Sequence, residues 1–226
     1  AMTGQITTES RSDDGRLKIA IQKSGRLSEK SFAILEKAGI SLLKSKDQLL
    51  CQARNFPLDI FLVRDDDIPA FLVKDVCQLG IIGQNSLLET QSLDPANFGG
   101  LQQVIELGFG RCRLSLAIPN GMAYQGVSSL AGKTIATSYR GLLSAFLAKN
   151  GVEADIVTME GAVEVAPRTH LADAICDLVS TGNTLVSNGL SEQDVILESQ
   201  AVIIQNNAMP DELRALSEKL LARITA

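Results

Sequence analysis

Residues 173–184 read DAICDLVSTGNT, an apolar run of strand length that ends in small hydroxyl residues around one glycine. The run predicts a buried β-strand over residues 174–179, and the polar residues after it predict a tight turn into a helix. Such a turn exposes backbone N–H groups at a helix N-terminus, and these groups bind phosphate well. The stretch therefore predicts an α/β fold with a phosphate site at the carboxyl end of one strand.

Short apolar runs alternate with helical patterns along the rest of the chain as well. Further strands are expected at residues 17–21, 58–63, 79–82, 113–118, 134–137, 154–158, 195–197 and 201–205, the last two as a pair. Helices are expected at 28–38 with Ser28 as the cap, from 65 onward, at 142–149 and at 210–224, and a loop at 90–100. This alternation is typical of βαβ units and a mostly parallel sheet.

We expect two α/β lobes with a ligand cleft between them, since small ligands commonly bind in such clefts. Residues 1–15 are expected to form a disordered tail. Lobe I is expected to contain residues 16–107 and 189–226, and lobe II residues 108–188 with the phosphate loop. The final helix carries an apolar stripe that either packs on its own lobe or contributes to a subunit interface, namely Leu213, Leu216, Leu220 and Leu221.

The composition excludes several classes of function. The chain of 226 residues has a formal net charge of −5 and only 4% aromatic residues, which disfavours nucleic-acid binding. Its apolar runs fall far short of the roughly 20 residues that a membrane span needs. His170 is the only histidine, and the four cysteines match no zinc or redox motif. We therefore predict no metal site built from protein ligands, and a reducing, cytoplasmic location.

The 173–184 stretch suits a phosphorylated sugar as ligand. Asp173 and Asp177 are four residues apart in a strand pattern and are expected to face the same side, where they would accept hydrogen bonds from sugar hydroxyls. A glycine in the loop lets the backbone approach the ligand. The phosphate is expected to contact Ser180, Thr181, Gly182, Asn183 and Thr184. The alternative is a simple helix cap after an ordinary strand, with both aspartates in turns.

Basic residues follow two of the other predicted strands. Lys23 and Arg26 flank Gly25 directly after the first strand, at the strand end where ligands of α/β proteins bind. Arg64 follows the strand at 58–63 and precedes three aspartates, which the helix dipole favours at a helix start. These cations either contact a polyphosphate or lie in solvated turns.

Seven motifs occur here in the order found in ATP phosphoribosyltransferases, namely KSGRLS, RDDDIP, LGIIG, GFGRCRLSLA, ATSY, VEVAPR and LADAICDLVSTGNTL. The chain therefore resembles the catalytic part of that family, from residue 17 to residue 205. VEVAPR followed by LADAICDLVSTG is the most specific match. The resemblance implies a short-form enzyme, or a long-form enzyme without its C-terminal histidine-binding domain. It also implies an α/β fold of two lobes in the periplasmic-binding-protein type II architecture.

The resemblance further implies a reaction and a set of roles. The family joins ATP and phosphoribosyl pyrophosphate to give N1-(5-phosphoribosyl)-ATP and pyrophosphate, the first step of histidine biosynthesis, with Mg²⁺ on the pyrophosphate. The loop after Asp177 would hold the ribose phosphate, with Glu164 of VEVAPR nearby. Arg26 and Lys23 are the predicted catalytic residues, and with Arg64 they would face the two polyphosphates. A homodimer is expected, with a separate regulatory subunit as a further partner.

Two residues depart from the family pattern. Gln48 stands where relatives commonly have an arginine, and Gln78 stands where they have an aspartate. These departures raise the alternative of a catalytically weak or inactive paralogue. A two-lobed protein that only binds a small ligand is the other alternative, and it leaves the STGNT loop unexplained.

Overall fold

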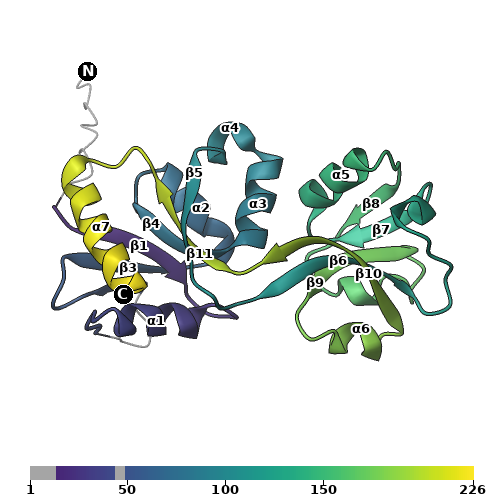
Figure 1. The fold of residues 1–226 in the computed structure, drawn as a ribbon, viewed down its shortest axis with the longest axis horizontal. Helices are drawn as coiled ribbons and strands as arrows, with labels where there is room; N and C mark the ends of the chain where they lie inside the picture. The colour runs from purple at the N-terminus through teal and green to yellow at the C-terminus, as the bar shows by residue number, and fades with distance from the viewer. Residues whose placement is uncertain (1–13, 44–48) are drawn as a thin grey trace, which may run out of the picture.

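The described strands form two separate β-sheets (Figure 1). The structure is a computed structural model that describes residues 14–43 and 49–226, so residues 1–13 of the expected tail lie outside the described residues. The first sheet has the order β2-β3-β1-β4-β11-β5, and the second has the order β10-β6-β9-β7-β8. The strands are β1 (Leu17–Gln22), β2 (Leu50–Gln52), β3 (Leu58–Val63), β4 (Leu79–Gly83), β5 (Leu101–Glu106), β6 (Cys112–Pro119), β7 (Thr134–Thr137), β8 (Asp155–Thr158), β9 (Ala174–Val179), β10 (Leu190–Ser199) and β11 (Ala201–Asn206).

Helices connect the parallel strands and cover the sheets. They are α1 (Ser28–Lys37), α2 (Ile68–Val73), α3 (Gln84–Leu93), α4 (Pro95–Phe98), α5 (Arg140–Lys149), α6 (Asn183–Ser187) and α7 (Asp211–Thr225), with the 3₁₀ turns η1 (Asp65–Asp67), η2 (Val127–Leu130) and η3 (Val163–Val165). The cap of α1 is Leu27 rather than the predicted Ser28, whose hydroxyl donates to the carbonyl oxygen of Lys23. Within the described part of the chain, no helix has both the length and the apolar character that crossing a membrane requires.

The parallel strands bring their ends together at one edge of each sheet. β1 pairs in parallel with β3 and β4, and β7 pairs in parallel with β8 and β9. The loops after β1, β3 and β4 therefore share one edge of the first sheet, and the loops after β7, β8 and β9 share one edge of the second. Ligands of open α/β sheets bind outside such carboxyl ends, so these two edges are where a site is expected.

The chain passes between the two sheets twice. β5 leads into β6 through residues 107–111, and β10 leads into β11 through Gln200. β10 pairs with β6 in the second sheet, whereas β11 pairs with β4 and β5 in the first. The predicted pairing of the last two strands with each other is therefore wrong, because the single residue between them carries the chain from one sheet to the other. β10 also extends the second sheet to Ser199, beyond the expected lobe boundary at residue 188.

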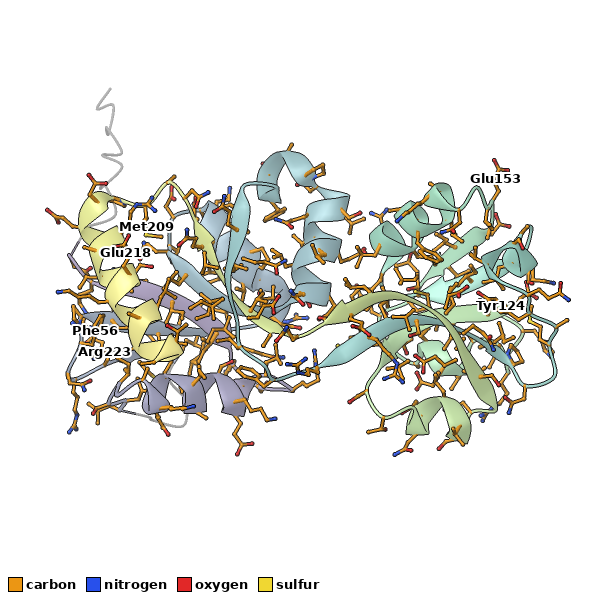
Figure 2. The ribbon with its side chains drawn as sticks, viewed as in Figure 1. Phe56, Tyr124, Glu153, Met209, Glu218 and Arg223 are labelled. Carbon is orange, nitrogen blue, oxygen red and sulfur yellow. The ribbon has the colours of Figure 1, made fainter. Side chains whose placement is uncertain are left out.

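The first sheet has buried apolar side chains on both of its faces. Helices α1 and α7 contribute to the core on one face, and α2, α3 and α4 contribute to the core on the other (Figure 1). Near the end of α7, the Arg223 guanidinium lies 4.9 Å from the ring of Phe56 (Figure 2). The predicted stripe of α7 packs on its own sheet, with two residues buried and two partly buried, namely Leu213, Leu220, Leu216 and Leu221.

The loop predicted at residues 90–100 is wrong, because most of this segment is helical. α3 continues to Leu93, and the short helix α4 begins one residue later. The carboxylate of Asp94 accepts the N–H of Asn97 at 3.3 Å, and Pro95 occupies the first turn. Asp94 therefore caps the N-terminus of α4, and Pro95 occupies the first helical position, where proline is well tolerated.

The two lobes meet through helix α3 of the first and the start of helix α5 in the second. The buried carboxylate of Glu89 accepts the N–H groups of Gly141 and Leu142, at 2.9 and 2.8 Å. Asn85 donates from Nδ2 to the hydroxyl of Tyr139 at 2.9 Å. The carboxylate of Glu89 thus accepts hydrogen bonds from N–H groups at the N-terminus of α5 that have no partner within the helix, a place where the helix dipole favours an anion. In this arrangement that helix end is not free to take a substrate phosphate.

Candidate active site

The predicted phosphate loop, residues 180–184, follows β9 at the carboxyl edge of the second sheet. Gly182 has a φ of +87°, a left-handed conformation that side chains with a Cβ rarely adopt. The hydroxyl of Thr181 accepts the N–H of Asn183 at 3.3 Å. Four of the five loop residues are exposed. Within the described residues, the backbone N–H groups of Thr181, Gly182 and Thr184 donate no hydrogen bond, so they are free for an anion.

Two carboxylates lie next to this loop. Asp177, on the last part of β9, is half-buried, and Glu164 comes from turn η3, which packs against β9. Burial raises the pKa of Asp177 above its ordinary value, a hydrogen bond from the N–H of Leu178 opposes this, and the nearby Glu164 charge raises the pKa further. A partly desolvated pair of like charges gains from hydrogen-bond donors or a cation between them. Ribose hydroxyls are such donors.

Asp173 is not brought together with the loop. It precedes β9 at the opposite end of the strand, and its carboxylate accepts the N–H of Thr134 at 2.9 Å. Asp173 lies just before β9 and Asp177 in its second half, so about four residues of extended strand separate the two carboxylates. The expectation that both contact the hydroxyls of one sugar is therefore not met. Asp173 instead fixes the start of β7 beside β9.

Cationic side chains gather at the carboxyl edge of the first sheet. Lys23 follows β1 and donates its N–H to the carbonyl oxygen of Val63, the last residue of β3, at 2.8 Å. Arg64 comes next after β3, and its side chain is 82% exposed and forms an ion pair with Asp66 at 4.0 Å. Lys23 and Arg64 therefore leave the ends of two adjacent parallel strands. Both are free to contact an anionic ligand.

Gly25 and Arg26 complete this edge. Gly25 has a φ of +108°, and a Cβ there would come within 2.7 Å of the Nε2 atom of Gln22. The adjacent Arg26 donates from Nη1 to the carbonyl oxygen of Gly110 at 2.6 Å, in the segment that joins the two sheets. Burial raises the pKa of Tyr139, in the second lobe, to about 12, and the nearby positive charge of Arg26 partly opposes this shift. Arg26 therefore lies where the two lobes meet, held in place at one nitrogen.

A pocket of about 320 Å³ lies between the lobes beside these groups. It is lined by the start of α3, by the paired end of β10 and start of β6, and by the first residue of the phosphate loop. Residues that line it include Gln84, Arg113, Ser180 and Gln200. The phosphate loop also borders a second hollow of about 380 Å³, on the face of the lobe that carries Arg113 and Glu192. Of the residues predicted from sequence, Ser180 lines the first hollow, and Thr181, Gly182 and Asn183 line the second.

Sequence patterns did not single out the ion pair that supports the phosphate loop. Arg113 donates from Nε and Nη2 to the carboxylate of Glu192, at 2.6 and 2.7 Å, and from Nη1 to the carbonyl oxygen of Ser180 at 3.2 Å. Ser115 donates to the same carboxylate at 2.6 Å. The hydrogen bond from Arg113 holds the pKa of Glu192 below its ordinary range. Only the pairing of β10 with β6 brings these residues together, and that pairing was not predicted.

Replacing Arg113 by methionine is expected to raise the KM for the ligand of the phosphate loop by roughly tenfold, about the value of one hydrogen bond from a charged group. The start of the loop loses its anchor while the apolar stem at residue 113 is kept. The expected change in kcat is much smaller, because Arg113 acts through Ser180. Arg214→Met is the matched control, since Arg214 also donates to a backbone carbonyl, that of Asn207 at 2.7 Å. A fall in kcat at an unchanged KM would contradict this role.

Gln78, one of the two departures from the family pattern, lies far from these groups. It precedes β4 at the amino edge of the first sheet, and its Oε1 accepts the N–H of Lys18 at 2.9 Å. The candidate site is at the opposite, carboxyl edge of the same strands. Gln78 is therefore not part of the site, and its departure gives no reason to expect lost activity. Gln48, the other departure, lies outside the described residues.

Two lobes joined by two crossings, with cations on one side of the cleft and a phosphate loop on the other, define a class of two-lobed α/β proteins that take small anionic ligands. The family model for ATP phosphoribosyltransferase matches residues 64–226. The ATP phosphoribosyltransferase of Bacteroides fragilis is 45% identical over 210 residues, which cover 93% of this chain and 72% of the relative. The chain belongs to the ATP phosphoribosyltransferase family. Its reaction joins ATP and phosphoribosyl pyrophosphate in the first step of histidine biosynthesis.

Solved structures agree with this assignment. The "ATP phosphoribosyl transferase (HisG:HisZ) complex from Thermotoga maritima" superposes with a TM-score of 0.74 at 29% identity, covering 92% of this chain and 98% of that one. The alkanesulfonate-binding protein SsuA from Xanthomonas axonopodis pv. citri, solved bound to MOPS, gives a TM-score of 0.56 at 16% identity, covering 94% and 73%. This second likeness shows the fold alone. The α/β fold of two lobes with a periplasmic-binding-protein architecture is thereby confirmed.

Proposed function

We propose that the phosphate loop holds the 5-phosphate of phosphoribosyl pyrophosphate, and that Asp177 and Glu164 accept hydrogen bonds from its ribose hydroxyls. The observation that carries this proposal is the juxtaposition of a partly desolvated carboxylate pair with a loop of free N–H groups. Hydroxyl donors stabilise the charged form of the carboxylates, while the N–H groups and loop hydroxyls surround the phosphate. Phosphoribosyl pyrophosphate is thus held both by its 5-phosphate and by its ribose hydroxyls.

The cations of the first lobe then face the polyphosphates. Lys23, Arg26 and Arg64 contact the pyrophosphate of one substrate and the triphosphate of the other across the cleft. Arg26 is the most precisely positioned of the three, because Gly110 already fixes one of its nitrogens. A donor held in place before the reaction stabilises a developing charge without the cost of reorganisation.

The reaction needs no nucleophile from the protein. N1 of adenine forms a bond to the anomeric carbon as the bond from that carbon to pyrophosphate breaks, and the chain contributes by orienting the two substrates and stabilising the leaving anion. Asp177 and Glu164 fit Mg²⁺ through intervening water, since this ion keeps several waters and takes few carboxylates. When bound, Mg²⁺ neutralises part of the pyrophosphate charge.

A matched pair of variants tests this proposal. Asp177→Asn is expected to weaken binding of phosphoribosyl pyrophosphate by about tenfold or more in the presence of Mg²⁺, because the amide offers the hydroxyls a weaker acceptor. Asp173→Asn should leave the affinity unchanged, because Asp173 bonds to Thr134 at the other end of β9. Isothermal titration calorimetry measures both. Equal affinities for the two variants would contradict the assignment.

We also infer the setting in which the enzyme works. The likeness to the HisG:HisZ complex from Thermotoga maritima, which has two different components, supports a separate regulatory subunit for this chain. Family membership supports a cytoplasmic location and a symmetric homodimer, the commonest assembly of soluble enzymes. Light scattering of the purified chain is expected to give twice the monomer mass. A monomer mass at micromolar concentration would contradict the homodimer.

A further inference from the structure

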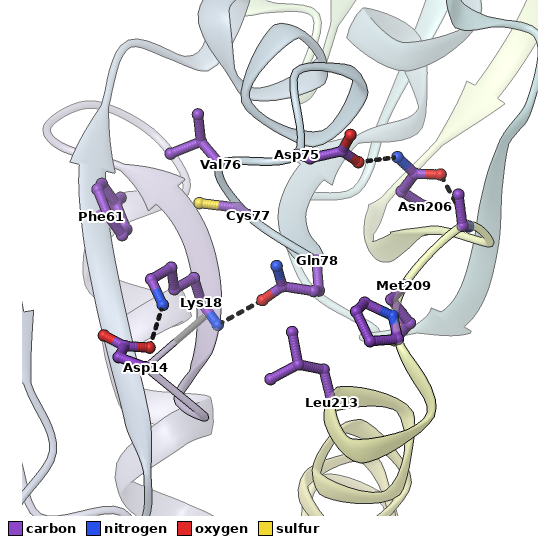
Figure 3. A pocket seen from close by; sticks show the side chains of 12 residues that line it. Asp14, Lys18, Phe61, Asp75, Val76, Cys77, Gln78, Asn206, Met209 and Leu213 are labelled. Carbon is purple, nitrogen blue, oxygen red and sulfur yellow. Dashed lines mark hydrogen bonds and ion pairs between the residues drawn. The ribbon is translucent and has the colours of Figure 1, made fainter. Parts of the chain in front are cut away.

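A second cavity opens at the amino edge of the first sheet, the edge opposite the candidate active site (Figure 3). Its volume is about 550 Å³, which suits a small molecule. Lys18 on β1 and Gln78 before β4 border it, together with the end of β11 and the start of α7. None of the residues assigned to catalysis or substrate binding lines it.

One part of this amino-edge pocket is apolar. Phe61 of β3, Met209 before α7 and Leu213 in the first turn of α7 form its walls, and Val76 adds to them. Met209 and Leu213 are buried in the fold itself. An apolar wall of this kind accommodates an aliphatic or aromatic side chain of a ligand.

Gln78 supplies an unpaired hydrogen-bond donor to the pocket. Its side chain is 9% exposed, and its Oε1 is occupied by the N–H of Lys18. Its Nε2 donates to no group among the described residues, and Figure 3 shows this nitrogen pointing into the pocket. This nitrogen is accessible from the pocket, so it can donate to an acceptor brought by a ligand or by water.

Charges of both signs accompany this donor. The ammonium group of Lys18 contacts the carboxylate of Asp14 at 2.8 Å. The carboxylate of Asp75 accepts from Nδ2 of Asn206 through one oxygen, at 3.2 Å. A ligand in the pocket therefore meets donors at Gln78 and Lys18 and an acceptor at Asp75. Since two carboxylates and one ammonium line the pocket, a purely anionic ligand is disfavoured.

We propose that the amino-edge pocket binds a small zwitterion with an apolar side chain, such as an aliphatic α-amino acid. The ligand carboxylate accepts from Nε2 of Gln78 and faces Lys18, and its ammonium group faces Asp75. Its side chain lies against Phe61 and Leu213. The site is separate from the reaction centre, although Lys18 and Lys23 stand at either end of the same strand.

The test uses L-leucine and two analogues that each lack one charged group, 3-methylbutylamine and 4-methylpentanoate. Calorimetric titration of the whole chain is expected to show leucine binding at least tenfold more tightly than either analogue. A preference of this size is about 1.4 kcal/mol. Leucine binding no tighter than the analogues, or no binding up to roughly 20 mM, overturns the proposal.

Two variants locate the binding. Gln78→Glu keeps the acceptor for the N–H of Lys18 but replaces the free donor by a negative charge, and it should weaken leucine binding at least tenfold. Gln125→Glu makes the same change at an exposed position of the other lobe and should have no effect. Asp75→Asn preserves the left-handed backbone at residue 75 and removes the counter-charge of the ammonium group, so it should weaken leucine binding as well. Leucine affinity that is the same in wild type, Gln78→Glu and Asp75→Asn overturns the assignment to this pocket.

Discussion

Replacing Arg26 by alanine is expected to lower kcat by about 10²-fold, the usual effect of losing one preorganised donor to a developing anion. Arg26 stands at the junction of the lobes, where its Nη1 donates to the carbonyl oxygen of Gly110. The side chain is exposed and makes no ion pair among the described residues, so its loss should cost the fold little. The measurement is the initial rate of pyrophosphate release at saturating ATP and phosphoribosyl pyrophosphate.

Two further variants make this result interpretable. Arg54→Ala removes an exposed arginine from the turn between β2 and β3 and should leave kcat unchanged. Arg26→Lys keeps the charge but loses the planar fork of donors, so it should recover only part of the activity. If Arg26→Ala retains the turnover and the KM of the wild type, Arg26 belongs to a solvated turn.

Replacing Gly182 by valine is expected to weaken phosphoribosyl pyrophosphate binding by at least about tenfold, or 1.4 kcal/mol. The cause is the backbone conformation, since φ is +87° and a β-branched residue is strained there. A Cβ at this position meets no protein atom within 4 Å, so the protein itself does not exclude the side chain. The expected loss of affinity comes from a displaced loop and from a side chain in the space that we propose for the phosphate.

Gly121 provides a closely matched control for this prediction. Its φ is also +87°, no described atom lies within 4 Å of its Cβ position, and it sits in the turn after β6, beside the start of β9, whereas the phosphate loop follows the end of β9. Gly121→Val should therefore lower stability by a similar amount while leaving the affinity unchanged. Calorimetric titration that finds equal affinities for Gly182→Val and wild type would remove the loop from the substrate site.

Local signals in the sequence were sufficient for most elements of the fold. The apolar runs at residues 17–21, 58–63 and 174–179 became β1, β3 and β9 because each is short, bounded by turn residues and buried on both faces of a sheet. The cationic residues after β1 and β3 could be placed together because parallel strands end at one edge. Lys23 and Arg64 do follow neighbouring strands.

The contacts that the sequence did not reveal are long-range. Nothing near Glu89 indicates that it caps a helix of the other lobe, and nothing near Arg113 indicates that Glu192 comes to it across β6 and β10. Asp173 was placed at the ligand because residues four apart in a strand share a face, but the same spacing puts Asp173 at the end of β9 that is distant from the loop. The pairing of strands and the packing of lobes bring these residues together. The sequence around each residue carries little information about that pairing.

The release of pyrophosphate by the purified chain with Mg²⁺ is the most direct measurement of the proposed reaction. We predict release only when ATP and phosphoribosyl pyrophosphate are both present, in a one-to-one ratio with N1-(5-phosphoribosyl)-ATP, and a strong loss of this activity in Asp177→Asn but not in Asp173→Asn. Pyrophosphate release without ATP, or full activity of Asp177→Asn, would contradict it.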